Sequence, residues 1–456
     1  MASAADSLAS GLNLSKFAQA TDLKKRLWFT IGALIVFRLL SYVPLPGVDP
    51  TALGVLSNQT NGGVLDFFNN FSGGSLKRMS LTALGVMPYI TASIVVQLAT
   101  SLSPTLAAIK KEGESGRKRL NQYTRYGTVA LTAVQGWFIA VGLEAYGANS
   151  GIQAVVEPGM LFRVGAVISL IGGTMFLMWL GEQITSRGIG NGVSLIIMAG
   201  IVANMPTNIY NLVNGSRTGS MDSFQVIGII VAVVAIILFI CFMERAQRRI
   251  LIQYPKRQTQ RGVQSDRSHL PLKLNTAGVI PPIFASSLLL MPLTITQLAG
   301  NKVKGDTWWG DVVIGLNQYL QHGSLLYMTL YGLGIIFFSF FYTAVTFQPV
   351  DVAENLKKQQ ANIPGIRPGK QTAEYIDRVL TRLTVAGSIY VATICVIPSV
   401  VALSLRVPFQ FGGTSLMIVV GVALETVNQI EAHLITRSYE GLTGPRMTRL
   451  SGRRTT

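Results

Sequence analysis

Residues 223–243 read SFQVIGIIVAVVAIILFICFM, a stretch that contains no charged residue. An α-helix rises 1.5 Å per residue, so about 20 apolar residues cross the roughly 30 Å hydrocarbon core of a bilayer. This stretch therefore predicts a membrane-spanning helix.

Nine further stretches of comparable length are almost free of charge, and only the first holds a charged residue, Arg38, near its middle. Hydrophobic residues make up 49% of the 456-residue chain, and charged residues make up 13%, about half the roughly 25% typical of soluble domains. We expect an all-α integral membrane protein with ten transmembrane helices in two pseudo-symmetric halves of five. The expected spans are 27–46, 79–102, 126–143, 164–181, 188–213, 223–243, 274–300, 323–347, 383–405 and 407–424.

Lysine and arginine are distributed unevenly between the two sets of loops. Thirty of the 38 fall before span 1, in the loops that follow spans 2, 4, 6 and 8, or after span 10. Because basic loops are retained in the cytosol, both termini are expected there. The predicted organisation is a cytosolic N-terminal arm at 1–26, halves at 27–213 and 214–430 with large cytosolic loops at 244–273 and 348–382, and a basic cytosolic tail at 431–456.

Side chains that could carry catalysis or bind a metal are sparse. Cys241 and Cys395 lie inside apolar runs, and the three histidines are scattered, so the sequence predicts no metal site and no cofactor. No paired carboxylates and no nucleophile beside a base are visible, which argues against a membrane-embedded enzyme. Arg38 and Glu425 are the charges nearest to the spans, and each has a structural or snorkelling interpretation. A transporter of a small solute remains the alternative, with a site built from Gln, Asn, Ser and Thr.

Helix-breaking residues concentrate in two of the expected spans. Gly85 and Pro88 fall in span 79–102, and Pro281, Pro282 and Pro292 fall in span 274–300. A kinked helix can bend or move, so these spans are the expected moving parts.

The stretch 61–75 between the first two spans is too short and too polar to cross a membrane. Its Leu65, Phe67, Phe68 and Phe71 are bracketed by glycine pairs, which suits a small re-entrant helix with flexible hinges. An ordinary loop on the outer face is the alternative interpretation.

The cytosolic loops carry more positive charge than orientation requires. The loop between spans 6 and 7 holds eight basic and two acidic residues, and the next large loop contains the turn PGIRPG at 364–369, with Arg367 at its tip. Such residues serve as membrane anchors, or they bind an acidic protein or an RNA backbone.

Two stretches carry a family resemblance. Residues 84–97 read LGVMPYITASIVVQ, and residues 179–194 read WLGEQITSRGIGNGVS. Both closely resemble signatures of the SecY family, the channel subunits of the bacterial general secretion (Sec) translocon. The resemblance extends over 71–74, 110–116, 269–273, 365–369 and 411–415 and covers nearly all ten spans.

The resemblance implies a protein-conducting channel of the plasma (inner) membrane, without enzymatic activity. It would translocate unfolded secretory polypeptides, and it would release hydrophobic segments sideways into membrane lipids through a lateral gate between the second and seventh spans. The implied apolar pore ring consists of Val86, Ile90, Ile197, Ile283 and Ile418. The implied plug is 63–74, including Val64, Leu65, Asp66, Phe67, Phe68 and Phe71. Gln97 and Asn275 are the expected polar gate residues.

The resemblance also implies partners. These are SecE-like and SecG-like small membrane subunits, a motor ATPase resembling SecA, the ribosome, and precursor polypeptides that bear a signal sequence. The expected docking residues for the motor or the ribosome are Arg367, Arg248, Arg249, Lys256 and Arg257.

Overall fold

A computed structural model describes residues 21–49, 69, 72–150, 155–218, 222–254, 257–259, 262–264, 267–299, 324–405 and 413–443. Each of the ten expected spans overlaps a helix in it. These helices are α3 (Thr21–Leu40), α6 (Met87–Leu102), α8 (Glu114–Ser150), α9 (Met160–Arg187), α10 (Gly192–Arg217), α11 (Ser223–Arg245), α12 (Ile280–Ala299), α14 (Leu325–Thr346), α16 (Lys370–Leu405) and α17 (Gly413–Thr443).

Within the described residues, seven helices are long and apolar enough to cross a membrane, or eight if one bent pair counts as a single span. The bent pair is α6 and α7 (Pro104–Lys111), which meet at an angle of 102°. Pro104 at the start of α7 explains the break, because proline disfavours the helical conformation in the residue before it. The expected all-α membrane architecture is confirmed.

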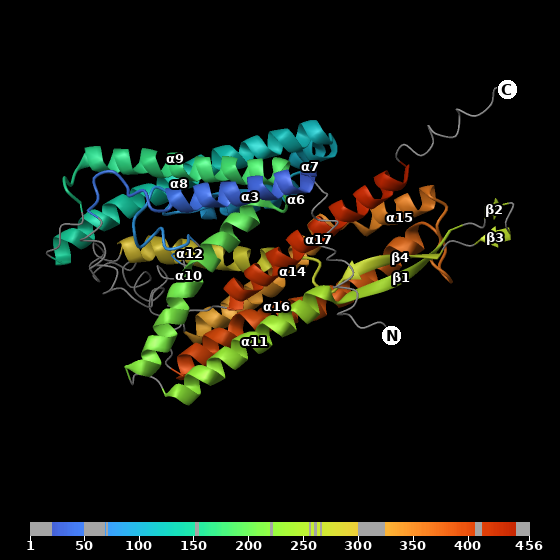
Figure 1. Ribbon diagram of the computed structural model, residues 1–456. Coiled ribbons are helices and arrows are strands. Elements are labelled where there is room, and N and C mark those ends of the chain that lie inside the picture. The colour runs from blue at the N-terminus through green and yellow to red at the C-terminus, as the bar shows by residue number, and fades with distance from the viewer. Residues whose placement is uncertain are drawn as a thin grey trace, which may run out of the picture.

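The helices fall into two groups that follow the order of the chain. Helices α3, α6, α8 and α9 run side by side, and α11, α14, α16 and α17 form a second group (Figure 1). Helix α10 contacts α9 in the first group and α17 in the second, while α12 contacts α6, α8 and α14. Helices α10 and α12 therefore join the two groups.

Several expected spans extend a few residues beyond their helices, as at the end of α3 (Leu40) and the start of α12 (Ile280), and span 79–102 differs most. Helix α6 begins at Met87, so the first eight residues of span 79–102 are not helical. They belong to a turn-rich stretch at 72–86, here called the entry segment, in which Met79 and Gly85 both have positive φ angles. The backbone of this segment pairs with the loop after α3, through Leu45 N to Met79 O at 2.9 Å and Leu81 N to Val43 O at 2.9 Å. Irregular backbone is tolerated inside a membrane protein where such partners satisfy it.

The two large loops that follow α11 and α14 form one folded body that the sequence did not predict. Strands β1 (Gln247–Gln253) and β4 (Arg267–Lys273) pair antiparallel, and β2 (Arg257–Thr259) pairs with β3 (Gly262–Gln264) beyond them. Gln253 and Asn362 exchange backbone hydrogen bonds of 2.8 and 2.9 Å, which link the hairpin to the loop after α15 (Pro349–Lys358). Figure 1 shows α15 beside this hairpin at one end of the molecule.

A separate hydrophobic cluster stabilises this folded body of the two loops. It contains Ile250, Ile252, Leu272, Leu356, Ala361, Ile363 and Ile376. Alternating buried residues of β1 supply one side, and the first turns of α16 supply the other. The body is therefore rigidly connected to a helix of the membrane region.

Candidate functional site: an apolar ring at the centre of the helices

The five residues expected to form the pore ring are all buried in the structure. Each is between 1% and 8% exposed, and all five belong to one hydrophobic cluster. They are contributed by four helices and by the residue that precedes α6. The contributions are Val86 and Ile90 from the start of α6, Ile197 from α10, Ile283 from α12 and Ile418 from α17.

The surroundings of these five side chains are apolar and free of charge. Met87, Ile94, Ile196, Ile201 and Met417 are buried in the same cluster. Among the described residues, the buried polar ones are serines, threonines and two asparagines, and no charged residue is buried. A ring of this kind offers an ion nothing to replace its water of hydration, so it can close a channel without a solid obstruction.

One buried polar contact next to the ring was missed by the sequence analysis. The Tyr331 hydroxyl and the Thr414 hydroxyl lie 2.7 Å apart and join α14 to α17. Thr414 precedes Ile418 by four residues on α17. A tyrosine in a span carries no sequence signal for such a pair, because the partner is 83 positions away.

The two expected gate residues lie on the expected helix pair but bond to other groups. Gln97 donates to Ser93 Oγ on its own helix at 3.3 Å. Asn275, just before α12, donates to Glu244 Oε1 at 2.7 Å and to the Gly278 carbonyl at 3.1 Å. The Glu244 contact ties the start of α12 to the end of α11.

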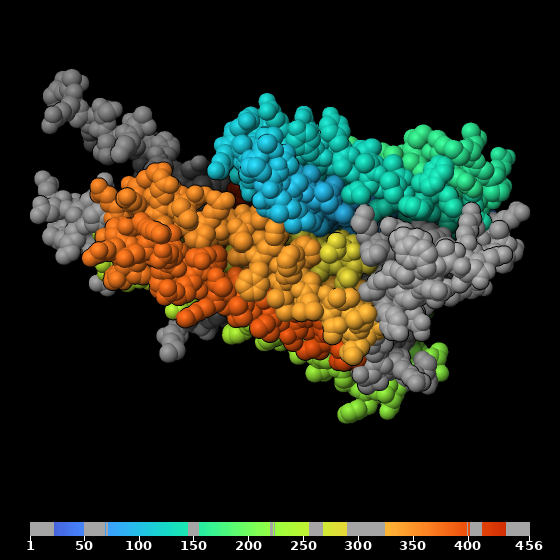
Figure 2. Space-filling view, turned by 180° about the vertical axis from the view of Figure 1, so that it is seen from behind, coloured from blue at the N-terminus to red at the C-terminus, as the bar shows by residue number. Residues whose placement is uncertain are grey.

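Helix α12 occupies the boundary between the two helix groups. It contacts α6 and α8 on one side and α14 on the other. Figure 2 shows its yellow surface emerging between the blue-to-cyan first group and the orange second group. A movement of α12 relative to α6 would open this boundary to the side.

Most of the expected plug lies outside the described residues, including Val64, Leu65, Asp66, Phe67, Phe68 and Phe71. The described part consists of Asn69 and of Ser72, Gly73 and Gly74. The last three are the first residues of the entry segment. The Gly73 carbonyl accepts hydrogen bonds from Arg38 Nη1 at 2.6 Å and from Arg78 Nη2 at 3.0 Å. The second glycine pair is thus held by side-chain contacts, where the sequence suggested a flexible hinge.

The residues expected to dock a partner, where the structure describes them, lie on the folded body of the two loops. Arg248 and Arg249 are exposed on β1, and Arg367 is exposed on the turn before α16, where its carbonyl accepts from Thr372 Oγ1 at 2.9 Å. Arg257 lies in β2, and Lys256 lies outside the described residues. Arg248 and Arg367, which are more than a hundred residues apart in sequence, thus belong to one folded body.

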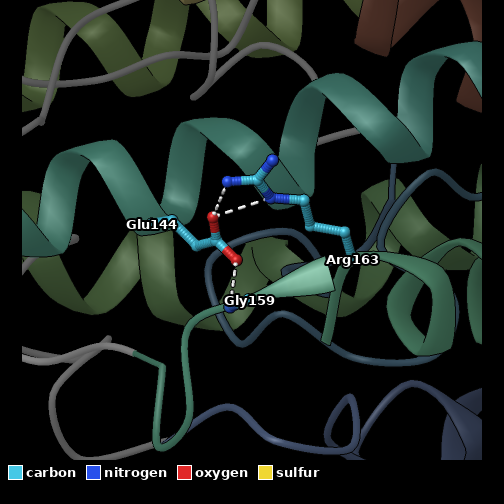
Figure 3. A network of polar contacts seen from close by, with 3 residues as sticks. All are labelled: Glu144, Gly159 and Arg163. Carbon is cyan, nitrogen blue, oxygen red and sulfur yellow. Dashed lines mark hydrogen bonds and ion pairs between the residues drawn. The ribbon is translucent and has the colours of Figure 1, made fainter. Parts of the chain in front are cut away.

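Two ion pairs fasten α8 to α9. Glu144 accepts from Arg163 Nε at 2.8 Å and Nη2 at 2.6 Å, and its other oxygen accepts from Gly159 N at 3.0 Å (Figure 3). Arg125 and Glu182 form a second pair at 2.6 Å nearer the other end. Both pairs are partly exposed and have a structural role. Within the described residues, no cluster of His, Cys, Asp and Glu could hold a metal ion.

Comparison with known proteins gives a consistent result. A family model described as SecY matches residues 80–427. The chain is 51% identical over 420 residues to the protein translocase subunit SecY of Escherichia coli strain K12, covering 92% of this chain and 93% of that protein.

Solved structures with a similar fold are also channels. One is described as a protein-conducting channel, with a TM-score of 0.62, 16% identity and coverage of 91% of this chain and 93% of the other. A second concerns the plug domain of a SecY protein, with a TM-score of 0.61, 18% identity and coverage of 91% and 92%. A third is Sec61 in a canine ribosome-channel complex from the endoplasmic reticulum, with a TM-score of 0.59, 16% identity and coverage of 91% and 93%.

Proposed function

Since this chain belongs to the SecY family of protein translocase subunits and forms a protein-conducting channel, we propose that polypeptides cross the membrane through the ring of Val86, Ile90, Ile197, Ile283 and Ile418. The observation that carries this proposal is the burial of all five side chains, from α6 and the residue before it and from α10, α12 and α17, within one hydrophobic cluster. Apolar side chains yield around a passing chain and bind no particular residue strongly, while they seal the resting channel by excluding water.

Hydrophobic segments leave the ring sideways between α6 and α12. Two observations support this route: the contact between these helices, and the boundary position of α12 between the two helix groups (Figure 2). Whether a segment leaves is a partition equilibrium, in which each leucine or isoleucine contributes roughly −0.3 to −0.6 kcal/mol and a central charge costs about 2.5 to 3.5 kcal/mol. Gln97 and Asn275 are the proposed polar residues of this gate, and residues 63–74 are the proposed plug. A related plug domain is described as stabilising the closed state of the channel in a solved SecY structure.

The chain is a multi-pass membrane protein, and we place it in the plasma (inner) membrane with both termini in the cytosol. The bias of lysine and arginine supports this orientation. The channel is passive and has no enzymatic role of its own. Its driving force comes from a motor ATPase resembling SecA or from a translating ribosome, and SecE-like and SecG-like subunits complete it. The ribosome-bound Sec61 neighbour supports the ribosome as a partner.

The experiment that tests the ring is site-specific photo-crosslinking. A photoreactive side chain at position 90 is expected to crosslink a stalled secretory precursor only when the precursor carries its signal sequence. The control position is Ile209 on α10, which is 54% exposed and lies outside the buried cluster. Signal-dependent crosslinks at 209 but none at 90 would contradict the proposed path, and the absence of crosslinks at both positions would favour the small-solute interpretation of the spans.

The docking proposal gives a second testable prediction. Replacing Arg367 by Glu is expected to slow motor-driven export at least severalfold, because the reversed charge repels an acidic partner surface. The matched control is Lys358→Glu, an exposed basic residue on the same folded body of the two loops that pairs with Glu354 within α15. Export kinetics measured in membrane vesicles check this prediction. Equal slowing by both variants would point to a general charge effect and would remove the specific role of Arg367.

A further inference from the structure

Arg38 is the one charged residue inside an expected span whose role the sequence left open. Its guanidinium donates through Nη1 to the Gly73 carbonyl at 2.6 Å and through Nη2 to the Tyr42 hydroxyl at 3.2 Å. The two terminal nitrogens of the guanidinium therefore bond to two different partners. A lysine ammonium lacks this planar two-armed geometry.

A second arginine converges on the same carbonyl. Arg78 donates through Nη2 to Gly73 O at 3.0 Å, and both guanidinium groups lie over the ring of Tyr42, at 5.0 Å for Arg38 and 4.2 Å for Arg78. Two like charges side by side repel each other, and the Gly73 carbonyl and the Tyr42 ring, which both guanidinium groups contact, offset part of this repulsion. We call Arg38, Arg78, Tyr42 and the Gly73 carbonyl the arginine clamp.

The clamped glycine also contacts α10 directly. Gly73 has a φ of +70°, and a β-carbon there would lie 3.0 Å from the α-carbon of Gly200. Asn204, one turn further along α10, donates to the Asn69 carbonyl at 3.4 Å. The two arginines thus hold the entry segment against α10. Only glycine fits at position 73, where the segment contacts Gly200.

Both sides of this contact lead to the pore ring within a few residues. Along α10, Gly200 is three residues from Ile197 and adjacent to the buried Ile201. Along the chain, the entry segment ends at Val86 and leads into α6, which carries Ile90. Ser75, Ser80 and Thr82 in between are almost fully buried, and the Thr82 hydroxyl lies 3.2 Å from the Ser80 hydroxyl and 3.4 Å from the Ser75 hydroxyl. A displacement at Gly73 is therefore transmitted through a close-packed segment to the ring.

We propose that Arg38 and Arg78 are positioning residues that seat the entry segment on α10 and so hold the α6 and α10 sides of the ring together in the closed channel. The inference rests on the proposed role of the ring. In this inference, the arginine clamp determines how tightly the closed channel excludes ions. Transport itself runs through the side chains of the ring, which the clamp does not contact.

The test measures ion leak through the full chain reconstituted in lipid vesicles, with no precursor present. Arg38→Gln removes the bridge between Gly73 and Tyr42, and we expect the leak to rise about tenfold, the change in an equilibrium when one charge-assisted hydrogen bond is lost. Gly73→Ala keeps both positive charges but displaces the carbonyl, and it should raise the leak to a similar extent. The double variant should leak no more than either single variant, because both changes release the same contact.

Matched controls distinguish a displaced entry segment from the loss of a positive charge and from a general folding defect. Arg163→Gln removes an arginine that pairs with Glu144 instead of the clamp, and Gly165→Ala adds a β-carbon with nothing within 4 Å; neither should change the leak. If Gly73→Ala leaves the leak unchanged while Arg38→Gln only alters the preference for anions over cations, then Arg38 acts by its charge and the inference is wrong.

A milder variant covers the case in which a clamp variant fails to fold. Tyr42→Phe removes only the hydroxyl acceptor from a side chain that is 56% exposed, and it should raise the leak about threefold. No rise there, in a protein with the parental unfolding temperature, overturns the inference. Translocation of a signal-bearing precursor is measured on the same vesicles. If the unsubstituted protein shows no ion leak but also does not translocate the precursor, the proposed function is contradicted. If it translocates the precursor but the clamp variants show no increased leak, only the proposed role of the clamp is contradicted.

Discussion

At the scale of single residues, the ring depends on side chains that carry no signal of their own. Ile197 is one of many isoleucines in the spans, and only its resemblance to a family position singled it out. In the structure it is 4% exposed and shares its cluster with Val86, Ile283 and Ile418. A hydrophobic ring seals by excluding water, so a single polar side chain at this position should weaken it.

We therefore expect Ile197→Asn to raise ion leak severalfold and to let precursors with defective signal sequences pass. The amide offers water and ions a partner in the ring, which lowers the barrier to wetting. Conductance measurements in planar bilayers check the first effect, and export assays check the second. Ile209→Asn on the exposed part of the same helix should leave both unchanged, and an equal effect there would mean that the substitution acts through α10 as a whole.

Arg38 illustrates a different limit at the same scale. A lone charge in a span signals a function or a snorkelling side chain, and the sequence does not distinguish between them. The partners of Arg38 are the Gly73 carbonyl and the Tyr42 hydroxyl. A backbone carbonyl 35 positions away has no residue type to recognise, so sequence reasoning could not identify it.

At the scale of elements, helix positions followed from the sequence, but the start of α6 did not. Apolarity over 79–102 predicts a continuous span, yet the structure replaces its first third with the entry segment. The segment is held by contacts to other elements, including a close approach of the Leu81 carbonyl to Gly173 of α9. Such a contact depends on a neighbour more than 90 residues later in the chain.

This close approach predicts opposite behaviour for two adjacent glycines. A β-carbon at Gly173 would collide with the Leu81 carbonyl, so Gly173→Ala should destabilise the protein by about 1 to 3 kcal/mol and shift the entry segment. A β-carbon at Gly172 meets nothing within 4 Å, so Gly172→Ala should be neutral or slightly stabilising because alanine favours the helix. Thermal unfolding of both variants in the same detergent checks this, and equal unfolding temperatures would contradict the packing.

At the scale of the whole molecule, the two helix groups are also joined at the turn between α9 and α10. The Gly190 amide donates to Gln429 Oε1 of α17 at 2.8 Å, and the Ile189 amide donates to Thr30 Oγ1 of α3 at 3.1 Å. A small cluster of Leu23 and Ile189, packed against Leu27, Ile430 and Leu434, lies beside these bonds. The turn therefore links α3 and α17, the first and last helices among the described residues.

Removing the acceptor should loosen this link. Gln429→Ala leaves the Gly190 amide without its side-chain partner, and we expect a loss of about 1 kcal/mol in the free energy of unfolding. Gln429→Glu keeps an oxygen acceptor and should restore most of the loss. Unfolding temperatures of the purified variants provide the measurement, and an equal loss in both would show that the amide group, and not the acceptor, is what matters.

The sequence by itself determined the membrane class and the ten helical segments, and it predicts their orientation. These properties depend on local composition: about 20 apolar residues span a bilayer wherever they occur, and lysine and arginine set the cytosolic side. The tertiary structure alone decided that the two large loops fold into one body, that α6 starts late, and that Arg38 and Arg78 share one carbonyl. The physical reason is that these features join groups far apart in the chain, and such contacts form only when packing brings the segments together.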